Sequence, residues 1–453
     1  MNLGKPQART SCRVWIRIGI MTVVMGDLAA AAQEAAAESG EDWWHGEFAA
    51  GDWGGVREHG GAVFVDFTAD NFWNTTGGQQ TGHAFFSLLE FGVELDMEKT
   101  TGWWRGGSFK ASGNFTEYTR GLTPDLVGDL NGVSNIEAPS GVRLYELWLA
   151  QTFFENQLTL QLGNMVADAD FVYNETAGTL INAGFGWSQF IAANTGSTVP
   201  AYPFAALGAR VAWGPTEQIQ FQSAIYDGNS LDNATDNNSD GLNFNLDSGW
   251  FFIGEIDWNL NQGTSDSGLP GTYQIGGFYH SENADDLYGD AGGNPWIVTG
   301  EDPVAHRGVY GLYIGGDQQV YCELGDDGEG QGMNVFLRVA GLPKNRSAVD
   351  LVVDAGIAYT GLLPGRDTDV TSFGVIYDRV SSEVARTEEA DRDINGAQIG
   401  SLSDYEMVLE FTYQAWINRW CYVQPDLQYI LHPGGSATVD NAFVVGIRVG
   451  LSF

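Results

Sequence analysis

The sequence predicts an all-β fold, a transmembrane antiparallel β-barrel of about 16 strands with short periplasmic turns and long extracellular loops. Three observations support this fold class. Apolar and polar residues alternate along most of the chain, aromatic residues gather near the ends of the alternating segments, and no apolar run reaches the roughly 18 residues that indicate a membrane-spanning helix. The barrel is expected over residues 61–453, after a lead-in of residues 33–60.

The alternation is clearest in the last segment of the chain. Its apolar row consists of Phe443, Val445, Ile447, Val449, Leu451 and Phe453. Apart from Val444, the intervening residues are small or polar, and segments 405–414 and 252–260 repeat the pattern. Alternate residues of a strand face opposite sides, so one row is expected to face lipid and the other a water-filled lumen. A soluble sandwich would turn its apolar row inward, but the charges and amides of the second row favour the membrane barrel.

Aromatic residues and connection lengths indicate where the strands end. The aromatic residues near segment ends include Trp43, Trp44, Trp103, Trp104, Trp416, Trp420 and Tyr422. Such positions match the interfacial girdles of membrane barrels. Long polar connections are expected at 228–248 and 282–306, with short turns between them. About 17 segments qualify as strands; because bacterial barrels have even numbers, one of the segments 62–72 and 317–325 is expected not to be a separate strand.

The N-terminus is typical of an export signal over residues 1–32. Four basic residues precede the short apolar stretch 18–25, and small residues follow before Gln33. The apolar stretch is too short to span a bilayer. Export would place the mature chain in an oxidising compartment, where Cys322 and Cys421 are able to form a disulfide if they lie close together.

The charge balance excludes one class of partner. The chain has 21 Lys and Arg residues against 58 Asp and Glu residues, a formal net charge of −37. Such a chain repels phosphate backbones, so nucleic acid is not an expected partner.

Four groups of short motifs, spread over nearly the whole mature chain, resemble the carbohydrate-selective porin (OprB) family. They are GDWGGVR at 51–57, LYELWL at 144–149 with LGN at 162–164, PAYP at 200–203 with ALGAR at 206–210 and YDGN at 226–229, and QPDLQYI at 424–430 with HPGG at 432–435. The resemblance implies a monomeric or homotrimeric 16-stranded barrel in a Gram-negative outer membrane, in contact with its lipid and lipopolysaccharide. It also implies passive diffusion of glucose and related monosaccharides, with residues 165–200 as the candidate loop that folds inward to narrow the channel.

A sugar channel needs hydrogen-bond donors and acceptors at its narrow point, together with aromatic faces for sugar rings. Positive charges that interrupt the acidic chain mark the expected constriction, and Lys110 and Arg210 fall in the lumen-facing rows of their segments. The predicted pore-lining residues are Trp103, Trp104, Arg105, Lys110, Glu117, Arg120, Arg143, Glu146 and Arg210. For each charged residue taken alone, an ordinary solvated charge of the barrel is the expected interpretation, whereas some members of the group are expected to line the narrowest point.

One segment has the spacing of a calcium loop. Asp236, Asn238, Asp240 and Asp247 match ligand positions of such a loop, although no helices flank it and loops rich in Asp and Asn give this spacing readily. A structural calcium ion is therefore a weak hypothesis, and no other cofactor is expected.

Two alternatives to a sugar channel remain open from the sequence. The first is a general or cation-preferring porin, which the acidic composition favours. The second is a barrel-borne outer-membrane hydrolase using His280 or His306. No GxSxG or HExxH motif supports it, so an enzyme is not expected.

Overall fold

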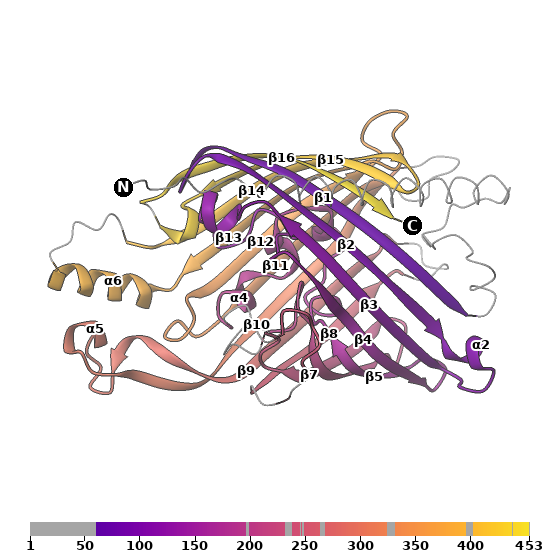
Figure 1. The fold of residues 1–453 in the computed structure, drawn as a ribbon, viewed down its shortest axis with the longest axis horizontal. Helices are drawn as coiled ribbons and strands as arrows, with labels where there is room; N and C mark the ends of the chain where they lie inside the picture. The colour runs from indigo at the N-terminus through magenta and orange to yellow at the C-terminus, as the bar shows by residue number, and fades with distance from the viewer. Residues whose placement is uncertain are drawn as a thin grey trace, which may run out of the picture.

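The computed structural model describes residues 60–195, 199–231, 238–244, 246, 249–262, 268–323, 331–395, 402–436 and 438–452. Over these residues, 16 antiparallel strands close into a barrel in which β1 pairs with both β2 and β16 (Figure 1). The predicted fold class and strand number are confirmed. The predicted export signal at 1–32 and all but the last residue of the lead-in lie outside the described residues.

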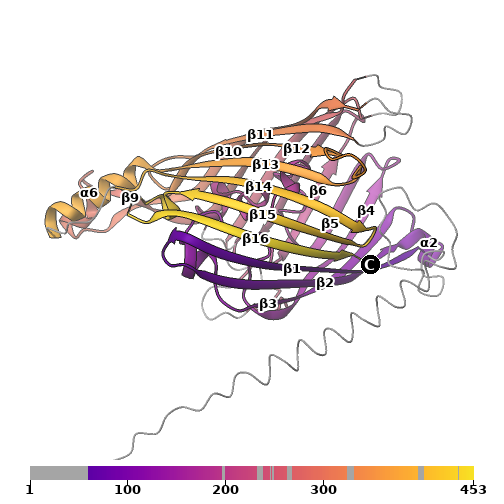
Figure 2. The same ribbon diagram turned by 90° about the horizontal axis from the view of Figure 1, so that it is seen from above.

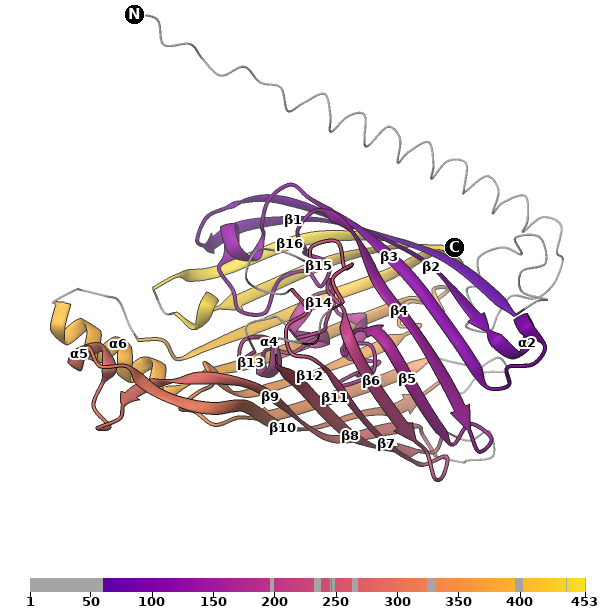
Figure 3. The same cartoon turned by 60° about the horizontal axis from the view of Figure 1, so that its bottom comes forward.

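Each strand pairs with its neighbours in sequence, so the topology is that of an up-and-down barrel. The strands are β1 (Gly61–Gly78), β2 (Gly82–Asp96), β3 (Gly107–Tyr118), β4 (Gly141–Phe153), β5 (Leu158–Met165), β6 (Ala206–Trp213), β7 (Ile219–Asp227), β8 (Trp250–Leu260), β9 (Gly271–Asp290), β10 (Pro303–Cys322), β11 (Gly332–Gly341), β12 (Val349–Thr360), β13 (Val370–Val380), β14 (Tyr405–Asn418), β15 (Cys421–Leu431) and β16 (Asp440–Ser452). Figure 3 shows the wall from β3 to β10.

Short helical elements lie in the connections. They are α2 (Met97–Thr101), η1 (Thr123–Val127), η2 (Ala177–Thr179), α3 (Ala183–Gly186), α4 (Gln189–Ala192), α5 (Trp296–Thr299), α6 (Ser382–Asn395) and η3 (Pro433–Gly435). Within the described part of the chain, none of the helices is both long enough and apolar enough to cross a bilayer.

The outer face of the barrel carries the apolar row that the sequence predicts. In β16, Phe443 and Ile447 are exposed on the outside, whereas Val444 and Arg448, each one residue further along, are buried inside. Aromatic pairs lie near the strand ends, such as Trp258 with Tyr273, whose ring centroids are 5.8 Å apart, and Trp416 with Tyr422 at 5.2 Å. This arrangement fits an apolar band bounded by interfacial aromatic residues.

The two ends of the barrel differ. We call the end that carries both the start of β1 and the end of β16 the turn end, and the opposite end the loop end. The long connections 119–140, 166–205, 228–249 and 381–404 all lie at the loop end.

The expected connection 282–306 is wrong: β9 runs on to Asp290 and β10 starts at Pro303, so this hairpin projects beyond the barrel beside α6 (Figures 1 and 2). Segment 317–325 is not a separate strand, because residues up to Cys322 continue β10.

Two of the long connections fold into the barrel. We call 119–140 the first inner loop and 166–205 the second inner loop. Their apolar residues pack against apolar side chains on the inner wall near the loop end. One such cluster contains Leu122, Leu126, Ile181 and Phe185 from the inner loops with Ile376, Val408, Ile430 and Val444 from the wall. The second row of each strand was expected to face a water-filled lumen, and this is wrong at the loop end, because the inner loops bury that part of the wall.

Candidate functional site

Arg338 of β11 holds the second inner loop in place. Its side chain is fully buried and ion-paired with Asp354 of β12. The guanidinium also donates to the backbone carbonyl oxygens of Val172 at 2.8 Å and of Gly184 and Phe185 at 3.1 Å each. A single wall side chain therefore satisfies several carbonyl groups that the fold removes from water.

Wall carboxylates satisfy the backbone N–H groups of the same loops. Glu410 of β14 accepts from the backbone N–H of Ile181 at 2.6 Å and of Asn182 at 2.9 Å. Glu406, also of β14, accepts from the backbone N–H of Leu130 in the first inner loop at 2.7 Å. Charge-assisted hydrogen bonds of this kind are stronger than neutral ones. Part of the acidic inner row is therefore used to dock the loops.

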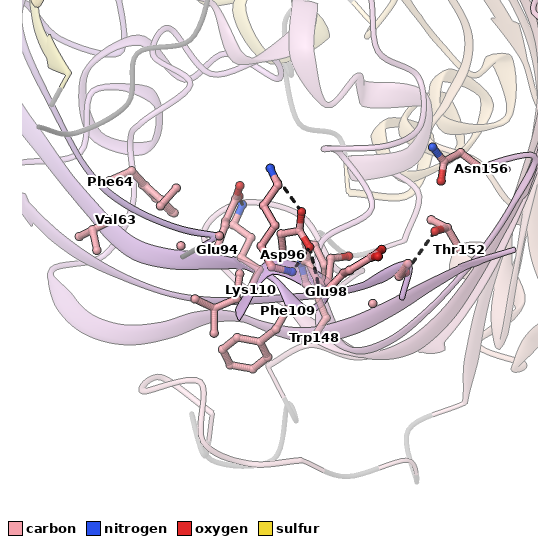
Figure 4. Close-up of a pocket in the computed structure, with 18 of the residues that line it drawn as sticks. Val63, Phe64, Glu94, Asp96, Glu98, Phe109, Lys110, Trp148, Thr152 and Asn156 are labelled. Atoms are coloured by element: carbon pink, nitrogen blue, oxygen red, sulfur yellow. Dashed lines mark hydrogen bonds and ion pairs between the residues drawn. The ribbon is translucent and has the colours of Figure 1, made fainter. Parts of the chain in front are cut away.

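The inner loops leave a cavity at the turn end, beside β1 to β4. Its volume is about 1150 Å³, and Lys110, Glu94 and Trp148 lie among its lining residues (Figure 4). Asp66 of β1 and Glu90 of β2 also line it. Because these strands form one continuous stretch of the wall, their inward side chains meet across neighbouring strands.

A β-bulge in β4 shapes this part of the wall. Tyr145 and Glu146 together face the single residue Ser112 of β3, because the register shifts by one residue there. Both side chains are buried. Strict alternation would turn one of them outward, so the extra residue brings a tyrosine and a carboxylate into the interior side by side.

Lys110 and Glu146 meet at the centre of the candidate site. The Lys110 Nζ atom lies 2.7 Å from a Glu146 carboxylate oxygen and 3.6 Å from a Glu94 carboxylate oxygen. The Trp148 indole donates to Glu146 at 3.1 Å, and Lys110 Nζ lies 5.5 Å from the centre of the Phe64 ring. We call these five residues the Lys110 cluster. It combines donors, acceptors and aromatic surface on one wall.

Arg143 also faces the interior, closer to the loop end. It donates to the Thr116 hydroxyl at 2.7 Å and to the Pro139 carbonyl oxygen of the first inner loop at 2.5 Å. Its guanidinium lies 5.0 Å from the centre of the Phe204 ring in the second inner loop. Arg143 therefore ties both inner loops to the wall.

Arg210 pairs with the second inner loop from the β6 side. Its guanidinium lies 3.1 Å from an Asp170 carboxylate oxygen and donates to Gln222 at 2.8 Å. Burial raises the pKa of Asp170, and the nearby charge of Arg210 opposes that rise. Burial likewise raises the pKa of Asp168 to about 6, although its carboxylate accepts from the Tyr202 backbone N–H. The second inner loop thus brings acidic groups into the interior next to the wall.

Five of the predicted pore-lining residues lie away from the cluster. Trp103, Trp104 and Arg105 belong to the turn after α2, not to a strand, because β3 starts only at Gly107. Trp103 is exposed, and Trp104 bonds to Gln151. Glu117 is paired in register with Ser87, in the row of β3 that alternates with the inward row of Lys110, and Arg120 lies beyond β3 at the loop end. Inward placement of Trp103, Trp104, Arg105 and Glu117 is therefore wrong, and of the nine predicted residues Lys110, Glu146, Arg143 and Arg210 face the interior.

Sequence reasoning missed the partners of Lys110 on the first two strands. Glu94 is directly opposite Lys110 in the β2–β3 register, and Glu90 lies four residues away in the same inward row. Their alternation with apolar residues is visible in the sequence. The register between neighbouring strands is not, so nothing in the sequence associates these carboxylates with Lys110.

The calcium hypothesis is only partly covered by the described residues. Asp236 and Asp247 lie outside them. Asn238 and Asp240 each accept a hydrogen bond from a backbone N–H of their own loop, at 2.8 Å from Asn243 and 3.1 Å from Leu242. The described residues contain no group of three or more acidic, His or Cys side chains arranged for a metal ion. The calcium site stays a prediction.

The two histidines of the hydrolase alternative lie at the loop end. His280 is buried and bonds to the Gly228 carbonyl oxygen at 2.8 Å. His306 bonds to Asp286 at 2.7 Å in the projecting hairpin.

The two cysteines do not form a disulfide. Cys322 and Cys421 are both free, since they lie in β10 and β15, which are not neighbours.

Comparisons with known proteins agree with this architecture. The family model described as carbohydrate-selective porin, OprB family, matches residues 82–453. Porin B of Pseudomonas aeruginosa is 28% identical over 446 residues, which cover 94% of this chain and 95% of that protein. The putative porin QuiX of Acinetobacter baylyi is 24% identical over 424 residues, covering 89% and 92%. The high-pH structure of Pseudomonas putida OprB has a TM-score of 0.81 at 25% identity, covering 91% of this chain and 100% of that one.

Proposed function

Because the chain belongs to the OprB family of carbohydrate-selective porins, it is an outer-membrane channel for carbohydrate diffusion and not an enzyme, and we propose that sugars pass beside the Lys110 cluster. The observation that supports this route is the turn-end cavity of about 1150 Å³ against the cluster. The inner loops lie in the interior nearer the loop end, where Arg338 and Glu410 anchor the second and Glu406 anchors the first.

The chemistry of the cluster suits a hydroxyl-rich solute. Lys110 offers ammonium donors, Glu94 and Glu146 offer acceptors, and Phe64 and Trp148 offer ring faces. A permeating sugar exchanges part of its hydration for these groups, and weak binding at several of them allows release. Arg143 and Arg210 act further along the route by holding the inner loops that narrow it.

We expect the inner loops to make the route selective for sugar size. Two inner loops share the lumen with the solute, so we propose that monosaccharides pass readily and that larger oligosaccharides pass slowly. Liposomes that contain the purified protein test this by their swelling rate in mono-, di- and trisaccharide solutions. Swelling in monosaccharide with a steep decline toward trisaccharide supports the proposal, and equal rates for all three contradict it.

A second candidate function is supported by the acidic interior. Asp66, Glu90 and Glu94 line the cavity, and Asp168 and Asp170 lie in the second inner loop. We propose that the same channel also conducts small cations in preference to anions, because lumen carboxylates attract counter-ions.

Partners and assembly follow from the same reasoning. We propose that the exposed apolar row contacts outer-membrane lipid and lipopolysaccharide, that residues 1–32 direct export, and that the barrel is a monomer or a homotrimer. The molar mass of the detergent-solubilised protein, from light scattering, decides between the two assemblies.

A further inference from the structure

The turn-end cavity contains more carboxylates than cations. The carboxylates that line it are Asp66, Glu90, Glu94, Asp96 and Glu98. Only two ammonium groups, Lys99 and Lys110, oppose them among the lining residues. Both are already engaged within the wall, Lys99 with Asp96 at 3.6 Å and Lys110 with Glu146 at 2.7 Å. A solute in the cavity therefore meets a surplus of negative charge.

Two guanidinium groups further along the interior are already engaged with partners other than the carboxylates of the cavity. Arg210 faces Asp170 at 3.1 Å. Arg143 is directed to the Thr116 hydroxyl and the Pro139 carbonyl oxygen, and its side chain is buried. Neither guanidinium balances the carboxylates of the cavity, so the negative surplus persists on the side where β2 and β3 meet.

Lys110 shows that this wall can hold a primary ammonium group. Its Nζ atom lies between the carboxylates of Glu146 and Glu94, with the face of Phe64 5.5 Å away. Carboxylates and an aromatic face are the surroundings that a sugar bearing an ammonium group prefers. Glu90 extends the same inward row of β2, four residues from Glu94, and offers a further acceptor to such a sugar.

We propose that the channel selects among sugars by charge, and that it admits amino sugars ahead of neutral sugars of the same size and retards sugar acids. This inference rests on the proposed sugar route past the Lys110 cluster. An ammonium group gains electrostatic attraction in the cavity without losing the hydroxyl contacts of the ring, whereas a sugar carboxylate is repelled.

Flux into liposomes that contain the full barrel tests the inference. The probes are a hexosamine in its ammonium form, the neutral hexose, the uncharged N-acetyl hexosamine and the hexuronate. At about 0.02 M salt, the hexosamine is expected to enter at least about twofold faster than the hexose, and the hexuronate at least about twofold slower. At about 0.5 M salt these ratios approach one, because screening shortens the range of the field to a few ångströms.

The carboxylates responsible are identified by isosteric substitution. The double variant Glu90→Gln with Glu94→Gln is expected to lose most of the preference for the hexosamine while it still passes the hexose. Glu301→Gln serves as the matched control, because Glu301 is an exposed carboxylate at the loop end, far along the barrel from this cavity. This control is expected to keep the wild-type ratios.

Two outcomes overturn the inference. One is a hexuronate flux equal to or greater than the hexosamine flux in the wild-type barrel. The other is an unchanged ratio in the Glu90→Gln, Glu94→Gln variant. In both cases the neutral hexose still enters, so the sugar channel itself stands. Absence of hexose flux, in contrast, contradicts the proposed function and the inference together.

Discussion

Lys110 is the residue on which the proposed sugar route depends most. It is the cation of the cluster, and it lies opposite Glu94 in the register of β2 and β3. Lys110→Ala is expected to weaken sugar block of the ion current several-fold, about 1 kcal/mol, because the sugar loses a donor. Current fluctuations in planar bilayers at increasing glucose concentration measure this affinity.

Lys99 provides the control for that measurement. Its ammonium group also lines the turn-end cavity, but the side chain is mostly exposed and pairs only with Asp96 at 3.6 Å. Lys99→Ala is expected to leave the affinity for sugar unchanged. An equal loss of affinity in both variants would mean that overall charge, and not the geometry of the Lys110 cluster, determines sugar binding.

Arg338 is the residue on which the inner architecture depends most. Its substitution by Ala leaves Asp354 buried without its partner and leaves carbonyl groups of the second inner loop unsatisfied. Breaking a buried ion pair costs about 3–5 kcal/mol. Arg338→Ala is therefore expected to lower the free energy of unfolding by about that amount, measured by urea titration in lipid vesicles.

Arg105 is the matched control for stability. It forms an exposed ion pair with Glu98 at 3.4 Å, and such pairs contribute about 0–1 kcal/mol. If Arg338→Ala proved as stable as Arg105→Ala, the second inner loop would not depend on the contacts described above.

At the scale of the element, the second inner loop is held mainly through its backbone. Asp317 of β10 accepts from the Thr176 backbone N–H at 2.7 Å and from its hydroxyl at 2.6 Å, and Glu410 accepts from Ile181. Asp317→Ala with Glu410→Gln is expected to loosen the loop without opening the barrel. Chymotrypsin, which cleaves after aromatic residues, is then expected to cut the loop near Phe171 or Phe185.

The wild-type barrel is the comparison for proteolysis. Wild-type protein is expected to resist chymotrypsin over the same time, since Phe171 and Phe185 are buried. Equal resistance of the double variant would show that the apolar contacts alone hold the loop.

The first inner loop contains a pH-sensitive carboxyl group. Burial raises the pKa of Glu137 from its ordinary 4.5 to about 7, although the group accepts from the backbone N–H of Thr123 and Leu122. The folded state thus binds this proton more tightly than the unfolded state does. Stability is therefore expected to fall as the pH rises from about 4.5 to about 7.

Urea titrations at several pH values across that range test this expectation. Glu137→Gln keeps a side-chain acceptor but has no proton to exchange, so its stability is expected to depend less on pH than that of the wild type. Part of the pH dependence is expected to remain in this variant, because burial also raises the pKa of Asp129, to about 6. An identical slope in the variant would contradict the role of Glu137.

The elements of the barrel were largely predictable from the sequence, whereas the inner loops were not. Alternation gives the outward row of β16 directly, because it depends only on neighbouring residues. The candidate inner segment 165–200 was inferred from resemblance. Its contacts with Arg338 and Glu410 connect it to strands that lie far from it in the sequence, so the alternation pattern does not reveal them. The β4 bulge that turns both Tyr145 and Glu146 inward likewise breaks the alternation from which orientation was inferred.

The turn before β3 shows a further limit of sequence reasoning. Residues 103–105 were predicted to line the pore, but Asp96 caps α2 by accepting from the backbone N–H of Glu98 and Lys99. Gly102 and Gly106 then adopt positive φ and turn the chain into β3. Position in a turn, not residue type, removes Arg105 from the interior.

At the scale of the whole molecule, the carboxylates of the interior have two different roles. Some carboxylates, such as Glu406 and Glu410, dock backbone N–H groups, and others, such as Glu90 and Glu94, line the cavity. The second group is expected to give the channel a preference for cations. The reversal potential across a salt gradient measures this cation preference. A reversal potential that indicates anion preference would mean that lysine and arginine side chains dominate the narrow part of the channel.

The most direct test of the central claim, a sugar-conducting path beside the Lys110 cluster, is conductance of the purified barrel in a planar bilayer while glucose is added. The account predicts a steady ionic conductance that glucose lowers in a saturable way in the wild type and much more weakly in Lys110→Ala. A barrel that conducts no ions, or whose current glucose leaves unchanged, would contradict it.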